Sequence, residues 1–147
     1  MTGDASRLTG LNLRIVYEDL PDLIEIEVRV LSGDWSGVAR AYTGPSSLAE
    51  EARSLLAWSR RPVGEFALDA GADTGIGWVH LRWYAVDLAG HLACHVQLAT
   101  SKAMDRPESA RLALEFPVEP YALEQFAHQI IAIVETLAGE AVLPIAA

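Results

Sequence analysis

The chain has 147 residues, which is the usual length of one domain with a single hydrophobic core. Hydrophobic residues make up 51% of it and charged residues 21%, so the polar, highly charged composition of a disordered chain is excluded. Twenty acidic against eleven basic side chains give a net charge of -9 at pH 7. Long-range electrostatics therefore disfavour nucleic acid and anionic membranes as partners.

The N-terminus, the apolar segments and the cysteine content together predict a soluble cytoplasmic protein. Residues 1–10 are small and polar, unlike a signal peptide, and are expected to form a flexible N-terminus. The longest apolar segment, 130–147, is interrupted by two glutamates, a glycine and a proline, so it is unsuitable for a membrane span. Cys94 is the only cysteine, and its apolar neighbours predict a buried, unreactive thiol in a reducing compartment.

Alternating apolar and polar residues predict three strands in the first third of the chain. In the first strand, near 12–17, the apolar face is expected to carry Leu13, Ile15 and Tyr17. The second strand, 23–31, presents four aliphatic side chains on one face and Glu25, Glu27 and Arg29 on the other. The third strand, 35–42, has small residues on one side, which implies that another layer packs closely there.

A helix, a short strand and a loop are expected next. Ser47 and Glu50 fit a capping box that would begin a helix running to about Arg60. A short strand is predicted at 65–69, before the glycine-rich loop 71–77. That loop leads into a strand instead of a helix, so it is not expected to bind phosphate.

The second half of the chain predicts a hairpin, a further strand and a helix. Alternation in 79–86 and 92–98 indicates two strands that share one apolar face, and 112–118 repeats the pattern beyond a loop at 100–109. Pro120 suits the first turn of a helix, whose apolar stripe ends near Gly139.

The order of these elements predicts the fold class. Strands come in runs separated by single helices, which is an α+β layout without repeating βαβ units. We expect an antiparallel sheet of about six or seven strands with two amphipathic helices packed on it. The single domain would span residues 11–140, with a C-terminal tail at 141–147.

No catalytic or metal-binding pattern passes a geometric check, so an enzyme, a metal site and a cofactor are not expected. His80, His91 and His95 share the polar face of the hairpin. Four residues of strand would hold His91 and His95 about 13 Å apart, which is too far for one ion. A two-residue turn would place His80 opposite Ala99, farther still from His91.

The polar sheet face is the best candidate for binding. Tyrosine and arginine are favoured at interaction hot spots, and a sheet presents them rigidly. The tentative binding residues are Glu25, Glu27, Arg29, Arg82, Tyr84, His95 and Gln97. An ordinary solvated sheet face is the alternative interpretation. A second hypothesis is a small-molecule pocket between sheet and helices, lined by Trp83, Phe116 and Phe126.

Several segments, spread over most of residues 10–140, resemble a known group of proteins. They are the turn at Trp35-Ser36-Gly37, the helix end at Leu55-Leu56-Ala57-Trp58, the run from Gly77 to Arg82, and the 112–116 strand joined through Pro120 to a helix. The chain resembles small, largely uncharacterised bacterial proteins, some of which are similar to immunity proteins that neutralise wall-associated contact toxins. The resemblance implies a non-enzymatic cytoplasmic protein that binds a toxin domain. A basic protein toxin would suit the acidic chain. The sequence does not distinguish a monomer from a homodimer.

Overall fold

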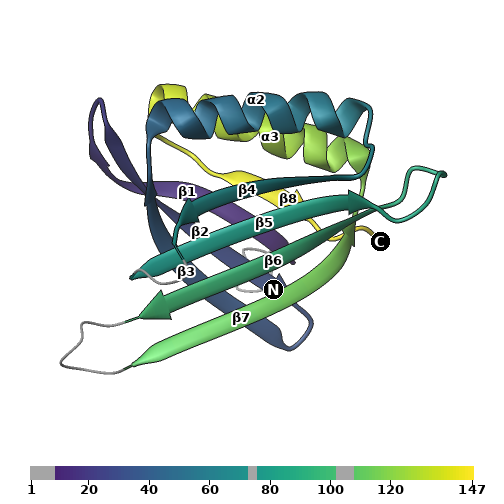
Figure 1. Ribbon diagram of the computed structural model, residues 1–147, viewed down its shortest axis with the longest axis horizontal. Coiled ribbons are helices and arrows are strands. Elements are labelled where there is room, and N and C mark those ends of the chain that lie inside the picture. Colours follow the sequence, from purple (N-terminus) through teal and green to yellow (C-terminus); the bar gives the residue numbers. More distant parts are fainter. Residues whose placement is uncertain (1–8, 73–75, 102–107) are drawn as a thin grey trace, which may run out of the picture.

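A computed structural model of the chain describes residues 9–72, 76–101 and 108–147, which form eight strands and two helices (Figure 1). In chain order the elements are β1 (Gly10–Asp19), β2 (Leu23–Ser32), β3 (Trp35–Thr43), α2 (Pro45–Arg60), β4 (Glu65–Gly71), β5 (Gly77–Ala85), β6 (Leu92–Ser101), β7 (Ser109–Val118), α3 (Pro120–Thr136) and β8 (Ala141–Pro144). All strand pairs are antiparallel, so the expected α+β class is confirmed. Neither described helix is long and apolar enough to cross a membrane.

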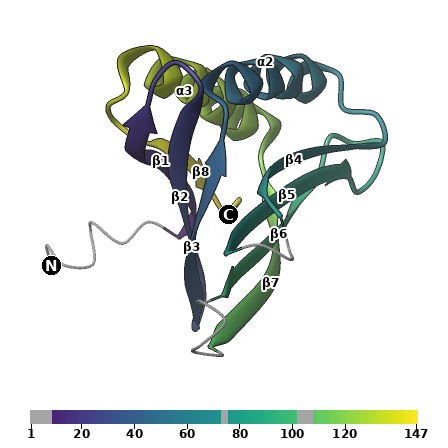
Figure 2. The same ribbon diagram turned by 60° about the vertical axis from the view of Figure 1, so that its left-hand side comes forward.

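The strands belong to two sheets of four, whereas the sequence suggested one sheet of six or seven. One sheet has the order β3-β2-β1-β8 and the other β4-β5-β6-β7. Figure 2 shows the two sheets inclined to each other, with both helices above them. The division occurs at α2, which carries the chain from the edge strand of the first sheet to the edge strand of the second.

Helices α2 and α3 lie side by side and cover the wider end of the space between the sheets (Figures 1 and 2). Helix α2 begins at Pro45, after Gly44, and has no side-chain cap, so the capping box predicted at Ser47 is wrong. Proline fits the first turn because its fixed φ is already helical and its missing N–H would have no partner there. Helix α3 begins at Pro120 as predicted.

The core lies where the inner faces of both sheets meet the helices. Its buried side chains include Ile24, Ile26, Val28, Val79, Leu81, Trp83, Leu55, Leu123, Phe126 and Ile130. Apart from Phe126, these are the apolar positions of the predicted strands and helices, so the predicted faces are confirmed for these elements. Cys94 is also buried, as expected, and burial raises the pKa of its thiol.

Close packing along β3 joins the two sheets. A Cβ atom at Gly77 would overlap the carbonyl oxygen of Arg40, and one at Gly37 would overlap the side chain of Leu112. At Gly77 only glycine permits the approach, because the neighbour is backbone, whereas at Gly37 the neighbour is the end of the flexible Leu112 side chain. The close packing predicted on the small-residue side of this strand is therefore confirmed.

The C-terminal segment contributes to the fold. Residues 141–144, predicted to be a tail, pair with β1 as strand β8. The N–H of Ala146 donates a hydrogen bond of 2.8 Å to the carbonyl oxygen of Pro117, which links the first sheet to β7. The expected flexible N-terminus lies outside the described residues for 1–8, and Gly10 already belongs to β1. Parts of the loops predicted at 71–77 and 100–109 also lie outside the described residues.

Candidate binding surface

The structure divides the tentative binding residues between two separate surfaces. Glu25, Glu27 and Arg29 point outward from β2 in the first sheet, while the other four lie on the outer face of the second sheet. Those four are Arg82, Tyr84, His95 and Gln97. The alternation of polar and apolar residues predicts all seven on one polar face, because it is the same in the strands of both sheets. The single composite surface is therefore wrong.

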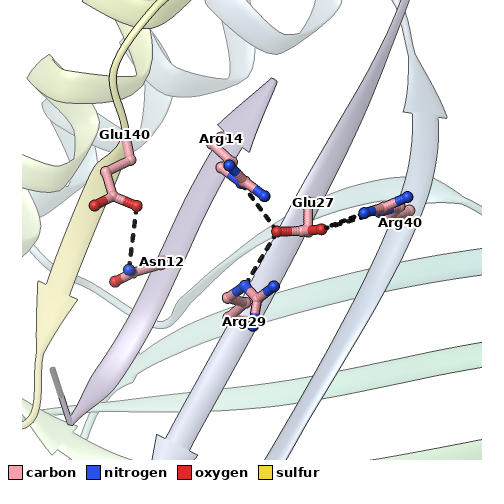
Figure 3. A network of polar contacts seen from close by, with 6 residues as sticks. All are labelled: Asn12, Arg14, Glu27, Arg29, Arg40 and Glu140. Carbon is pink, nitrogen blue, oxygen red and sulfur yellow. Dashed lines mark hydrogen bonds and ion pairs between the residues drawn. The ribbon is translucent and has the colours of Figure 1, made fainter. Parts of the chain in front are cut away.

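Three arginines surround Glu27 on the outer face of the first sheet (Figure 3). We call Arg14, Arg29, Arg40 and Glu27 the arginine cluster. Nε of Arg14 and Nε of Arg29 donate to Glu27 Oε1 at 2.9 and 3.1 Å, and Nε of Arg40 donates to Oε2 at 2.9 Å. The register explains this convergence, because Arg14, Glu27 and Arg40 lie opposite one another on three adjacent strands.

The carboxylate of Glu27 is enclosed by the arginines themselves. Its side chain is 1% exposed, whereas the side chains of Arg14, Arg29 and Arg40 are 48%, 56% and 57% exposed. Burial raises the pKa of Glu27, but the hydrogen bonds from the three arginines and the charge of Arg14 outweigh that effect and lower the pKa below its ordinary 4.5. Glu27 is therefore ionised at neutral pH, and the cluster keeps a surplus of two positive charges.

A row of exposed tyrosines lies next to the arginine cluster. Tyr17 and Tyr42 lie opposite Glu25 on the neighbouring strands and are 50% and 51% exposed. Tyr17 was predicted on the apolar face, and a β-bulge between Ile15 and Tyr17 turns it outward instead. Nothing in the local alternation signals this bulge.

The β1–β2 turn adds acidic side chains beside the tyrosine row. Asp19 and Asp22 are both exposed there, and Leu20 between them is 49% exposed. We define the acidic tyrosine patch as Tyr17, Asp19, Leu20, Asp22, Glu25 and Tyr42; Glu18 is left out because it pairs with the buried Ile24 and points to the other face. It contains no basic residue, so it differs in charge from the adjacent arginine cluster.

A groove of about 720 Å³ runs beside β3, where the first sheet meets the start of β5. Arg29 and Arg40 line it together with the apolar side chains of Val38 and Ile76 and the ring of Tyr42. Its size is within the usual range for small-molecule sites.

The outer face of the second sheet carries polar side chains that mainly contact one another. Arg82 pairs with Glu65 at 2.9 Å, and its guanidinium carbon lies 5.0 Å from the centre of the Tyr84 ring. The Tyr84 hydroxyl donates to Glu115 at 2.8 Å, and that hydrogen bond raises the pKa of Tyr84. His95 Nδ1 is 3.3 Å from Glu115 without hydrogen-bond geometry. These mutual contacts are typical of a solvated sheet face.

The histidines of the hairpin lie apart. His80 is opposite Gln97, not Ala99, because the turn after β5 spans residues 86–91 and is longer than two residues. His91 Nδ1 lies 2.7 Å from Asp87, and that hydrogen bond raises the pKa of His91. Among the described residues, no three metal-ligating side chains come close enough to hold one ion.

The small-molecule pocket predicted between sheet and helices is occupied by side chains. Trp83 and Phe126 are fully buried with ring centroids 6.2 Å apart, and Phe116 is 3% exposed. All three belong to the core, and the groove beside β3 is lined by other residues.

Comparisons of the chain with protein-family models, with curated proteins and with solved structures found no match.

Proposed function

We propose that the chain is a non-enzymatic protein-binding module of the toxin-neutralising, immunity type. It acts in the cytoplasm and contacts its partner through the acidic tyrosine patch. The observation that carries this proposal is the row in which Tyr17 and Tyr42, both half exposed, lie on either side of Glu25.

Rigid, exposed tyrosines favour binding to another protein. A tyrosine supplies a large contact area with few rotatable bonds, so little side-chain entropy is lost when a partner covers it. Tyr17 and Tyr42 extend from paired strands of one sheet, whose ladder fixes their spacing before any partner arrives. A preformed surface of this kind lowers the free-energy cost of association.

The charge of the patch favours a basic partner. Asp19, Asp22 and Glu25 supply three acidic side chains, and the chain as a whole carries a net charge of -9. The negative electrostatic field of these side chains accelerates association with a positively charged protein and weakens as salt is added. It also disfavours a homodimer in which two acidic patches face each other.

The direct test is protection of cells against a toxin encoded beside the gene. We expect co-expression of the chain to restore growth, and the purified proteins to associate. The double variant Tyr17→Ala, Tyr42→Ala should weaken association by about thirtyfold or more, because two hot-spot contacts are lost. The matched control is Tyr121→Ala on α3, since that tyrosine is 71% exposed and lies outside the patch. No association with the toxin, or equal losses in the two variants, would contradict the proposal.

Charge reversal tests the electrostatic part separately. Asp19→Lys with Asp22→Lys should slow association of a basic toxin and reduce its salt dependence, while leaving the dissociation rate nearly unchanged. An association rate that is insensitive to both salt and charge reversal would exclude electrostatic attraction of the toxin by Asp19 and Asp22.

A further inference from the structure

We propose that the arginine cluster and the adjoining groove form a binding site for a small phosphate monoester with an apolar body. The proposal does not rest on the toxin-neutralising function, because it depends on the arginine cluster, although Tyr42 and Glu25 belong to both the acidic tyrosine patch and the groove. It involves binding alone and no chemical step.

The surplus charge of the cluster is the first argument. Three guanidinium groups share a single carboxylate, which leaves two positive charges unbalanced at a site in an otherwise acidic chain. A phosphate monoester carries two negative charges above its second pKa of about 6, so it would balance this surplus. A single carboxylate would balance only half of it.

The hydrogen-bond donors of the cluster are the second argument. Arg14 and Arg29 contact Glu27 through Nε, and their Nη groups have no acceptor among the described residues. Both Nε atoms bind the same oxygen of Glu27, so the two guanidinium groups are held close together. Guanidinium N–H groups arranged in this way match the oxygens of a phosphate group.

The preorganisation of the cluster is the third argument. Glu27 holds the arginines at fixed positions on three adjacent strands before any ligand binds. Less rotamer entropy is then lost on binding than with free arginine side chains.

The groove supplies a place for the rest of the ligand. Arg29 and Arg40 belong to both the cluster and the groove wall, so a phosphate held by the cluster adjoins the groove. Val38, Tyr42 and Ile76 provide apolar surface in the groove, which Glu25 also lines, and Val38 and Ile76 are 42% and 79% exposed. The groove wall is closely packed at the junction of the two sheets, where Gly77 packs against the backbone of Arg40.

Phenyl phosphate is a suitable probe, with inorganic phosphate and phenol as its two halves. Binding would be followed by chemical-shift changes in NMR titrations near pH 8, where the monoester is a dianion. We expect phenyl phosphate to bind at millimolar concentration or below, and each half to bind at least about tenfold more weakly. No binding of phenyl phosphate, or equal binding of inorganic phosphate, would overturn the proposal.

Arginine variants inside and outside the cluster distinguish binding at the cluster from a nonspecific effect of positive charge. Arg14→Gln with Arg29→Gln should weaken phenyl phosphate binding by about tenfold or more. Arg53→Gln on α2, also exposed, is the control and should leave the affinity within about twofold. Equal affinity of both variants would refute the site, provided that far-UV circular dichroism shows both to be folded.

A groove variant remains informative even if the arginine variant unfolds. Ile76→Ser changes a largely exposed side chain and should weaken phenyl phosphate while leaving inorganic phosphate unaffected. An unchanged affinity for phenyl phosphate would remove the groove from the proposal and overturn it. A phosphotyrosine peptide that binds more than about tenfold tighter than phenyl phosphate would assign the site to a phosphorylated protein instead.

Discussion

Replacement of Glu27 by glutamine tests how the arginine cluster contributes to stability. The variant keeps the size and shape of the side chain but removes the only carboxylate that the three arginines share. The amide can still accept hydrogen bonds through one oxygen, while its NH2 group meets an arginine donor. At least one arginine then loses its acceptor, and the three positive charges repel one another without a counterion.

The expected loss of stability follows from the exposure of the arginines. A hydrogen bond to a charged group contributes about 1.5–3 kcal/mol when well shielded, and less when one partner is in water. Because each arginine is about half exposed, we take about 1 kcal/mol for each of the three contacts. Glu27→Gln should therefore lower the free energy of unfolding by about 2–3 kcal/mol at pH 7, out of a typical total of about 5–15 kcal/mol.

Urea denaturation is the appropriate assay, because urea leaves ionic strength unchanged. With a slope of about 2 kcal/mol per molar urea, the midpoint should fall by about 1 M. Glu25→Gln is the matched control, since Glu25 lies two residues away on the same face and makes no hydrogen bond or ion pair with an arginine among the described residues. Both variants remove one negative charge from an acidic chain. The difference between their urea midpoints therefore measures the contribution of the arginine cluster to stability.

The stability contribution of Glu27 depends on pH. The pKa of Glu27 is lower in the folded protein than its ordinary 4.5, so its contribution is fully present above 4.5. That contribution is lost as the pH falls through the folded pKa. The difference between wild type and Glu27→Gln should thus be constant near neutrality and shrink below pH 4.5. Equal midpoints for the two glutamine variants, or a difference independent of pH, would refute the reasoning.

Three further predictions concern other parts of the molecule. Gly77→Ala should destabilise the protein by about 2–4 kcal/mol in urea denaturation, because the new Cβ would overlap the carbonyl oxygen of Arg40; a wild-type midpoint would contradict the close packing. Cys94 should react with a thiol reagent at pH 8 only in urea, since burial keeps its pKa high; rapid labelling of the native protein would disprove this. Asp87→Asn should lower the pKa of His91 toward its ordinary 6.5 in NMR titrations. The His91 ion pair stabilises the fold below pH 6.5 and is lost as pH rises through the folded pKa, so an unchanged titration would exclude the contact.

The sequence was sufficient for features that depend on neighbouring residues. Alternation in 23–31 correctly separates the buried face of β2 from Glu25, Glu27 and Arg29, because successive side chains of a strand point to opposite faces. The buried state of Cys94 follows from the same periodicity. Pro120 correctly marks the start of α3, since proline fits the first turn of a helix.

The features that define the candidate surfaces depend on which strands pair and in what register. Glu27 meets Arg14 and Arg40 only because the register of β1, β2 and β3 aligns them, and Tyr17 joins that face only through a bulge. The separation of Arg82 and His95 from this surface likewise follows from the division into two sheets. Alternation is a local property with a period of two residues, and it is the same in either sheet. Pairing, by contrast, is set by hydrogen bonds and packing between distant segments, so only the tertiary structure decides which polar side chains come together.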